Sequence, residues 1–113
     1  MKHVHYTDVN REKVDDPAAT GVNVRWLITR EDGAEVFAMR RFDVKAGGHT
    51  PHHSHDFEHE VFVLEGGGTL KVEGEEEDLK KGDVVFIPAD VKHQFVNDRD
   101  ETLSFLCLIP YKD

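Results

Sequence analysis

Residues 47–66 have the sequence GGHTPHHSHDFEHEVFVLEG and hold five of the eight histidines of the chain. Imidazole is a ligand for metals such as zinc, manganese and iron, so this density of histidines indicates a metal site. His53 and His55 are two residues apart, which places both rings on one face of a strand because side chains alternate along it. His59 keeps the same parity if the strand continues. The alternative is a solvated polar loop.

Length and charge limit the classes of function. With 113 residues the chain is large enough for one domain, 1–113, and too small for two. A formal net charge of -9 argues against nucleic acid and anionic membranes as partners. No apolar run has the length of a transmembrane helix, and the N-terminus lacks a signal-peptide core. The single cysteine excludes an internal disulfide and predicts a cytoplasmic location.

Residues 1–20 form an N-terminal arm, in which the alternating segment 2–6 predicts an edge strand. His3 and His5 have the spacing of metal ligands, but they stand alone at a terminus, where chains fray. The Asp-Asp-Pro sequence at 15–17 ends any regular element there.

The rest of the chain is predicted to be all-β. No stretch has a helical apolar period over a useful length. Glu75 to Asp78 is expected to be a solvated turn. The hairpin at 22–44 turns at Glu31–Gly33. The expected strands are 22–29, 35–44, 61–64, 69–73, 84–87, 92–96 and 102–109. Many short strands separated by Gly, Pro and Asp turns predict a sandwich or a small barrel.

A second motif lies at residues 82–97, with the sequence GDVVFIPADVKHQFVN. Together with residues 47–66 it resembles the paired motifs of the cupin family, G-x5-H-x-H-x3,4-E-x6-G and G-x5-P-x-G-x2-H-x3-N, with 15 residues between them. The resemblance implies a cupin double-stranded β-helix, the jelly-roll barrel. Two positions depart from the pattern. Asp90 replaces a glycine in a turn, where Asp is an accepted substitute, and His59 stands where the glutamate usually is.

The third metal ligand is therefore either His59 or Glu60. His59 has the six-residue gap to Gly66 and shares strand parity with His53 and His55, and a bulge near Asp56 would favour Glu60 instead. With His59, the chain resembles the small four-histidine, manganese-type cupins. That resemblance implies one divalent ion on His53, His55, His59 and His93, with manganese first, iron next, and zinc, nickel or copper possible.

The substrate pocket is predicted from strand parity. Phe95 shares a face with His93, and Phe105, Cys107 and Ile109 share a face of the last strand. In the subgroup that the chain resembles, the residues matching Phe105 and Cys107 lie in the cavity. A small buried hydrophobe is the alternative role for Cys107. Arg40 could bind a substrate carboxylate, although either Arg40 or its neighbour Arg41 can point inward, not both.

The function expected from these features is a metal-dependent oxidoreductase, such as a dioxygenase, acting on a small molecule. The alternatives are a metal-dependent isomerase or lyase, and a small-molecule-binding module without activity. No catalytic residue and no organic cofactor can be assigned from the sequence. Exposed strand edges and an apolar outer sheet face, with Phe62, Leu106 and Leu108 as candidates, predict a homodimer.

Overall fold

The computed structural model describes residues 1–111, so Lys112 and Asp113 of the expected domain lie outside the described residues. The bounds of the elements are η1 Tyr6–Asp8, β1 Glu12–Lys13, β2 Thr20–Ile28, η2 Arg30–Asp32, β3 Phe37–His49, β4 His59–Glu65, β5 Gly67–Val72, β6 Glu75–Lys80, β7 Val84–Ile87, β8 His93–Val96 and β9 Leu103–Pro110. The elements η1 and η2 are single turns of 3-10 helix.

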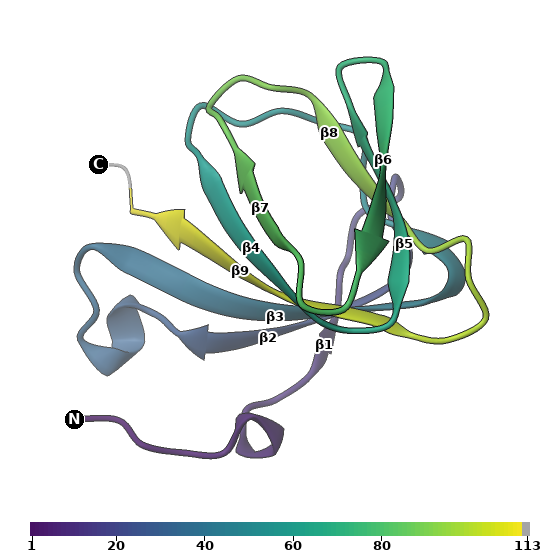
Figure 1. Cartoon of the computed structure of the whole chain (residues 1–113). Helices are drawn as coiled ribbons and strands as arrows, with labels where there is room; N and C mark the ends of the chain where they lie inside the picture. The colour runs from purple at the N-terminus through teal and green to yellow at the C-terminus, as the bar shows by residue number, and fades with distance from the viewer. Residues whose placement is uncertain (112–113) are drawn as a thin grey trace.

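The strands form one antiparallel sheet in the order β6-β5-β8-β3-β9-β4-β7, and β2 and then β1 extend from β3. Figure 1 shows this sheet curling round, so that β4 and β7 face β5 and β8 across the interior of the barrel. The predicted all-β class and jelly-roll barrel are confirmed. None of the helices in the described part of the chain is long and apolar enough to span a membrane.

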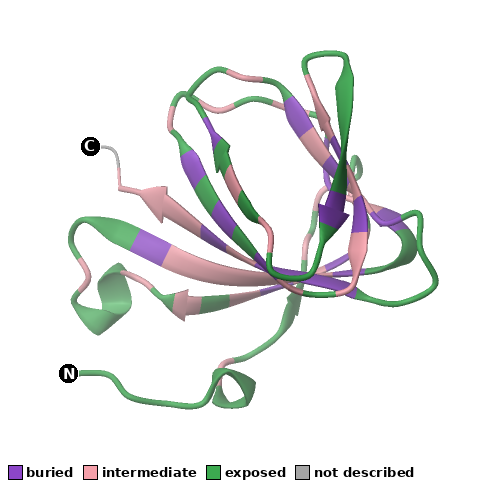
Figure 2. Ribbon diagram, viewed as in Figure 1, coloured by how far each residue is buried: buried purple, intermediate pink, exposed green. Residues whose placement is uncertain are grey.

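Alternation along the strands places apolar side chains inside the barrel. In β4, for example, His59, Val61 and Val63 are buried, while Glu60 and Phe62 between them are exposed. Figure 2 shows this as alternating bands along the strands. The core includes Val44, Val63, Leu103 and Phe105, which are at most 2% exposed. The interior of the barrel therefore holds a packed apolar core.

Two features tie the centre of the barrel together. The register of β3 and β9 pairs Arg40 with Cys107 and Phe42 with Phe105. Asn97, the last residue of the second motif, is fully buried. Its Nδ2 atom donates to the carbonyl oxygens of Val44 at 2.8 Å and Glu101 at 2.7 Å. These bonds join the end of β8 to β3 and to the loop before β9.

The expected edge strand at residues 2–6 is wrong, because the first strand is β1 and residues 6–8 form η1. A local contact favours the turn, since the His5 ring accepts a hydrogen bond from the Thr7 amide. The arm is then held from the sheet: the guanidinium of Arg25 donates to the carbonyl oxygens of Tyr6 and Val9, both at 3.0 Å.

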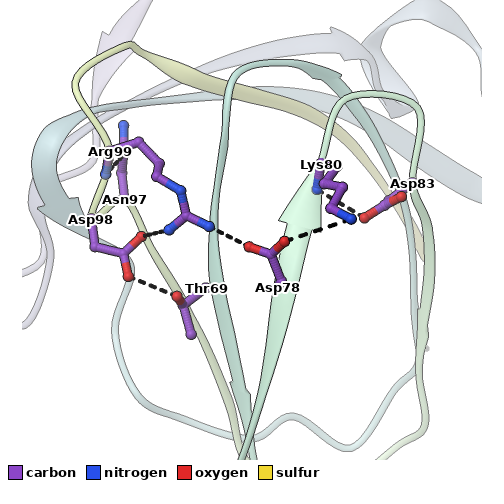
Figure 3. A network of polar contacts seen from close by, with 7 residues as sticks. All are labelled: Thr69, Asp78, Lys80, Asp83, Asn97, Asp98 and Arg99. Atoms are coloured by element: carbon purple, nitrogen blue, oxygen red, sulfur yellow. Dashed lines mark hydrogen bonds and ion pairs between the residues drawn. The ribbon is translucent and has the colours of Figure 1, made fainter.

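The expected turn at Glu75–Asp78 is also wrong, because these residues lie in β6, which pairs with β5 along its whole length. The turn comes earlier, at Glu73 and Gly74, whose φ angles are 47° and 83°. The acidic side chains of β6 point to solvent, and Asp78 contacts Arg99 (Figure 3). Backbone pairing with β5 therefore outweighs the low strand propensity of the acidic residues.

Candidate functional site

The four histidines of the expected ligand set reach the site from three elements. His59 begins β4 and His93 begins β8. The segment from residue 50 to 58 lies outside the named strands, so the expectation that His53, His55 and His59 share one continuous strand is wrong. Backbone bonds hold the segment instead. His53 and His93 exchange bonds of 3.1 and 2.9 Å, and the His55 carbonyl oxygen accepts from the Asp90 amide at 2.6 Å.

Asp90 explains how the second motif tolerates its departure from glycine. Its φ angle is 67°, in the left-handed region where glycine is normally preferred and Asp is among the better substitutes. The amide that bonds His55 belongs to this residue. The turn therefore keeps the shape the motif requires and also positions one of the histidines.

The four rings lie together. The ring centroids of His53 and His55 are 4.2 Å apart, and those of His59 and His93 are 4.9 Å apart. Centroid distances of 5.3 Å separate His53 from His93, and 5.2 Å separate His55 from His59. Phe57 stacks on the His55 ring at 4.8 Å with an interplanar angle of 7°. No pattern in the sequence indicated this contact.

All four histidines are held in the neutral form that metals bind. Burial, followed by the positive charges of neighbouring groups, lowers the pKa of His53 to about 4 and that of His59 to about 3. Burial also lowers the pKa values of His55 and His93. The Nδ1 atom of His93 donates to the Val91 carbonyl oxygen at 2.9 Å, which leaves the lone pair on Nε2.

Four neutral imidazole rings that lie close together suit a transition metal ion. In addition, the Nδ1 atom of His59 is buried without a hydrogen-bond partner. As the side chains stand in residues 1–111, however, no three His, Cys, Asp or Glu residues are grouped as an ion would require. Binding would therefore require the rings to turn about their side-chain bonds until their nitrogen atoms converge.

Glu60, the alternative third ligand, is exposed on the opposite face of β4. Of the other histidines, His52 is exposed, and His49 is half-buried with its Nδ1 atom 3.3 Å from Nε2 of Gln94. His3 and His5 are exposed in the arm. The structure thus places His59, and not Glu60, beside the other three rings.

A cavity of about 220 Å³ opens beside the rings. Four of the predicted pocket residues line it, namely Arg40, Phe95, Phe105 and Cys107. Burial raises the pKa of the Cys107 thiol, so its sulfur is not a thiolate. The prediction for Ile109 is wrong: it lines a separate hollow with Phe37 and Glu60, because it lies farther along β9 than the cavity reaches.

The cavity also has walls that the sequence interpretation missed. They are Val14, Asp16, Val22, Phe42, Thr50 and Pro51. Phe42 could have been found, because it shares strand parity with Arg40. No sequence pattern indicated that Val14 and Asp16 would line the cavity. They come from the segment after β1, which is brought over the barrel by the bond from the Val14 amide to the Val22 carbonyl oxygen at 3.0 Å.

The barrel fold and the paired histidine motifs are those of a cupin. Residues 40–109 match the family described as Cupin domain. The chain belongs to the cupin family. It is similar to the polyketide cyclase RemF from Streptomyces resistomycificus, with 40% identity, a TM-score of 0.94, and coverage of 99% of this chain and 80% of that one.

Two further proteins are similar to this chain. A cupin 2 conserved barrel domain protein from Rhodopseudomonas palustris has 28% identity and a TM-score of 0.83, over 92% of this chain and 72% of that one. The 1-methylthio-D-xylulose 5-phosphate methylsulfurylase of Rhodospirillum rubrum is 37% identical over 63% of this chain and 46% of its own length. The chain spans about half the length of the curated relatives it matches.

Proposed function

We propose that this cupin is a metal-dependent enzyme that acts on a carbonyl group of a small molecule without a redox step, as an isomerase, lyase or cyclase does. The observation that carries the proposal is the cluster of four neutral imidazoles beside a cavity. His53, His55, His59 and His93 would hold one divalent ion. Four neutral ligands leave the charge of the ion uncompensated, and when bound it supplies Lewis-acid stabilisation to an oxyanion.

The chain's own residues prepare this chemistry. His93 is fixed in one tautomer by the Val91 carbonyl oxygen, so its free nitrogen needs no proton loss before it acts as a ligand. Phe95 and Phe105 stack with their ring centroids 4.5 Å apart and form an apolar wall that excludes water. The site therefore combines ready ligands with a dry surface for a substrate.

The similarity to a polyketide cyclase supports the non-redox class, because it extends over nearly the whole chain. A polyketide is a carbonyl-rich chain, and its cyclisation requires carbonyl polarisation. Manganese remains the first choice of ion by resemblance, followed by iron, with zinc, nickel and copper possible. The cytoplasmic location also stays a prediction.

The metal is tested first. Purified protein should carry about one transition ion per chain, measured by plasma mass spectrometry. The double variant His53→Ala/His55→Ala should lose it, because two adjacent ligands are removed. His52→Ala, an exposed neighbour, serves as the matched control and should keep the ion. Unchanged metal content in the double variant would contradict the proposal.

Catalysis is tested on 2,4-pentanedione, a small dicarbonyl compound. Metal-loaded protein should accelerate deuterium exchange at the carbon between its carbonyls, measured by NMR under argon. The double variant should not accelerate it. Exchange that appears only in air would reject the non-redox class.

The second candidate is the dioxygen-dependent oxidoreductase expected from the sequence. It is favoured by the phenylalanine-lined cavity, which suits an aromatic substrate, and by the Cys107 sulfur there. If this class is right, metal-loaded protein treated with peroxide should form sulfinic or sulfonic acid at Cys107, detected by mass spectrometry of its peptide. Metal-free protein should form far less. Equal oxidation in both would remove this support.

A further inference from the structure

Arg40 carries the one fixed positive charge among the described residues that line the cavity. Its guanidinium carbon lies 4.8 Å from the ring centroid of Phe42 and 5.4 Å from that of Trp26. One terminal nitrogen, Nη2, donates to the Cys107 sulfur at 3.1 Å. The aromatic rings and the strand register between β3 and β9 thus hold the guanidinium in place.

The hydrogen bonding of this guanidinium is incomplete. The Nε atom of Arg40 is buried and has no hydrogen-bond partner. The sulfur that receives the Nη2 hydrogen is a weak acceptor, and burial keeps the thiol neutral. A buried charged donor without an acceptor is unfavourable. An oxyanion in the cavity is a stronger acceptor for Nη2 than the sulfur that now accepts its hydrogen.

We propose that Arg40 forms a subsite for the oxyanion of a small planar substrate, a carboxylate or an enolate attached to an unsaturated skeleton. This inference rests on the proposed function and names the substrate class for that site. A planar oxyanion matches the fork of the guanidinium, which binds two oxygens through parallel bonds.

Electrostatics supports an anion at this place. Arg40 lines the same cavity as the His53, His55 and His59 rings. Asp16 is the one carboxylate among the lining residues of the described chain. An anion between Arg40 and the rings is therefore attracted from one side and meets neutral imidazoles on the other.

The shape and chemistry of the walls favour a flat ligand. Phe42 and Phe105 stack at 5.4 Å with an interplanar angle of 27°, and Phe95 continues the stack. The Thr50 hydroxyl is already used, because it accepts from the Phe95 amide at 2.9 Å. A sugar phosphate would leave its hydroxyls short of partners here. The cavity volume of about 220 Å³ is below the range of drug-sized pockets, so one ring fits best.

The test uses benzoate as the planar anion and benzamide as its neutral counterpart, with metal-free full-length protein. Calorimetry should show benzoate binding, and benzamide should bind roughly tenfold or more weakly. Arg40→Met should weaken benzoate roughly ten- to a hundredfold. Arg41→Met is the matched control, because Arg41 stacks on Tyr6 and contacts Asp43. Its benzoate affinity should stay at the wild-type value.

A second variant guards against misfolding. Arg40→Lys keeps the charge but not the fork, so benzoate affinity should fall between wild type and Arg40→Met. The proposal would be overturned if wild type and a folded Arg40→Met bound benzoate with equal affinity, or if benzamide bound as tightly as benzoate. It would also be overturned if inorganic phosphate displaced benzoate more readily than acetate does. Arg40-dependent binding in a protein that takes up no metal would uphold the subsite and reject the proposed function.

Discussion

The His93 ring forms a hydrogen bond with the carbonyl oxygen of Val91, which lies only two residues earlier in the chain. A carbonyl oxygen can only accept, so Nδ1 must carry the proton and Nε2 the lone pair. The backbone just before β8 thus fixes the tautomer of the ring at the start of that strand. His59 has no such contact, because its Nδ1 atom is buried without a partner. Of the buried His59 and His93 rings, His59 is therefore the one with a nitrogen atom that still needs a partner.

The lowered pKa values of the histidines predict acid-sensitive stability in metal-free protein. Unfolded histidines bind protons near pH 6.5, whereas burial lowers the pKa of folded His59 to about 3 and that of His53 to about 4. The unfolded state therefore binds more protons in this window, and stability falls as pH drops from about 7 towards 4. Above pH 7 the contribution is complete. Urea unfolding of metal-free wild type at pH 7 and pH 5 should show the loss.

His59→Gln should reduce that pH dependence, because it removes one buried titrating ring. His52→Gln, at an exposed position, should leave the dependence as in wild type. The window between pH 7 and 5 lies above the usual range of carboxylates, so acidic residues contribute little. A His59→Gln protein with the wild-type slope would refute this assignment.

At the scale of elements, the Gly66-Gly67-Gly68 run allows neighbouring backbones to approach closely. A Cβ atom at Gly68 would lie 2.3 Å from the Val96 carbonyl oxygen, and one at Gly66 would lie 2.2 Å from that of Thr102. These atoms belong to the last residue of β8 and to the residue just before β9, and neither is a flexible side-chain end. Gly68 is therefore a packing requirement between β5 and β8, and Gly66 is one at the entry to β9.

Gly68→Ala should destabilise the protein by about 1–3 kcal/mol, because backbone must move to admit the methyl group. The measurement is urea unfolding monitored by the fluorescence of Trp26. Gly74→Ala offers a contrast: it has nothing within 4 Å and a φ angle of 83°, so its cost is conformational, about 1–2 kcal/mol. A Gly68→Ala protein as stable as wild type would show that the two strands separate easily.

The sequence predicted well what depends on local alternation. The strand at Val84–Ile87 has its expected bounds, and Phe95 lines the cavity as its parity with His93 predicted. Phe105 and Cys107 were predicted from parity together with the resemblance to the small four-histidine cupins, and they also line the cavity. Prediction from the sequence failed where pairing with a strand distant in the chain determines the structure. The acidic segment of β6 is a strand because β5 requires a neighbour. Asp16 enters the cavity wall only because the arm folds over β2, which no local pattern encodes.

At the scale of the whole molecule, apolar side chains remain on the outer face of β4, β7 and β9. We name these residues the outer patch: Phe62, Val84, Phe86, Leu106 and Leu108. Val84 is 78% exposed and Phe86 is 56% exposed, while the two leucines are half-buried. Strand register joins Phe62 to Val84 on one side and to Leu106 on the other, while Glu60 lies between Phe86 and Leu108. Contiguous apolar surface of this kind marks interaction sites.

We expect two copies to pair through the outer patch, as the sequence predicted for Phe62, Leu106 and Leu108. Light scattering at micromolar concentration should give the mass of a dimer. Phe62→Glu/Phe86→Glu should give a monomer, because two charges would be buried at the interface. Val36→Glu, at an exposed apolar position outside the patch, should remain dimeric. A monomeric wild type would reject the interface.

The place of β9 has a consequence for biosynthesis. It is the last of the described strands, yet it pairs with β3 on one side and β4 on the other. Until residues 103–110 have emerged from the ribosome, those two strands have open edges, and Arg40 has no Cys107 beside it. Such edges attract other chains. The nascent chain should therefore need shielding by chaperones until β9 has emerged, and the cavity can form only after that.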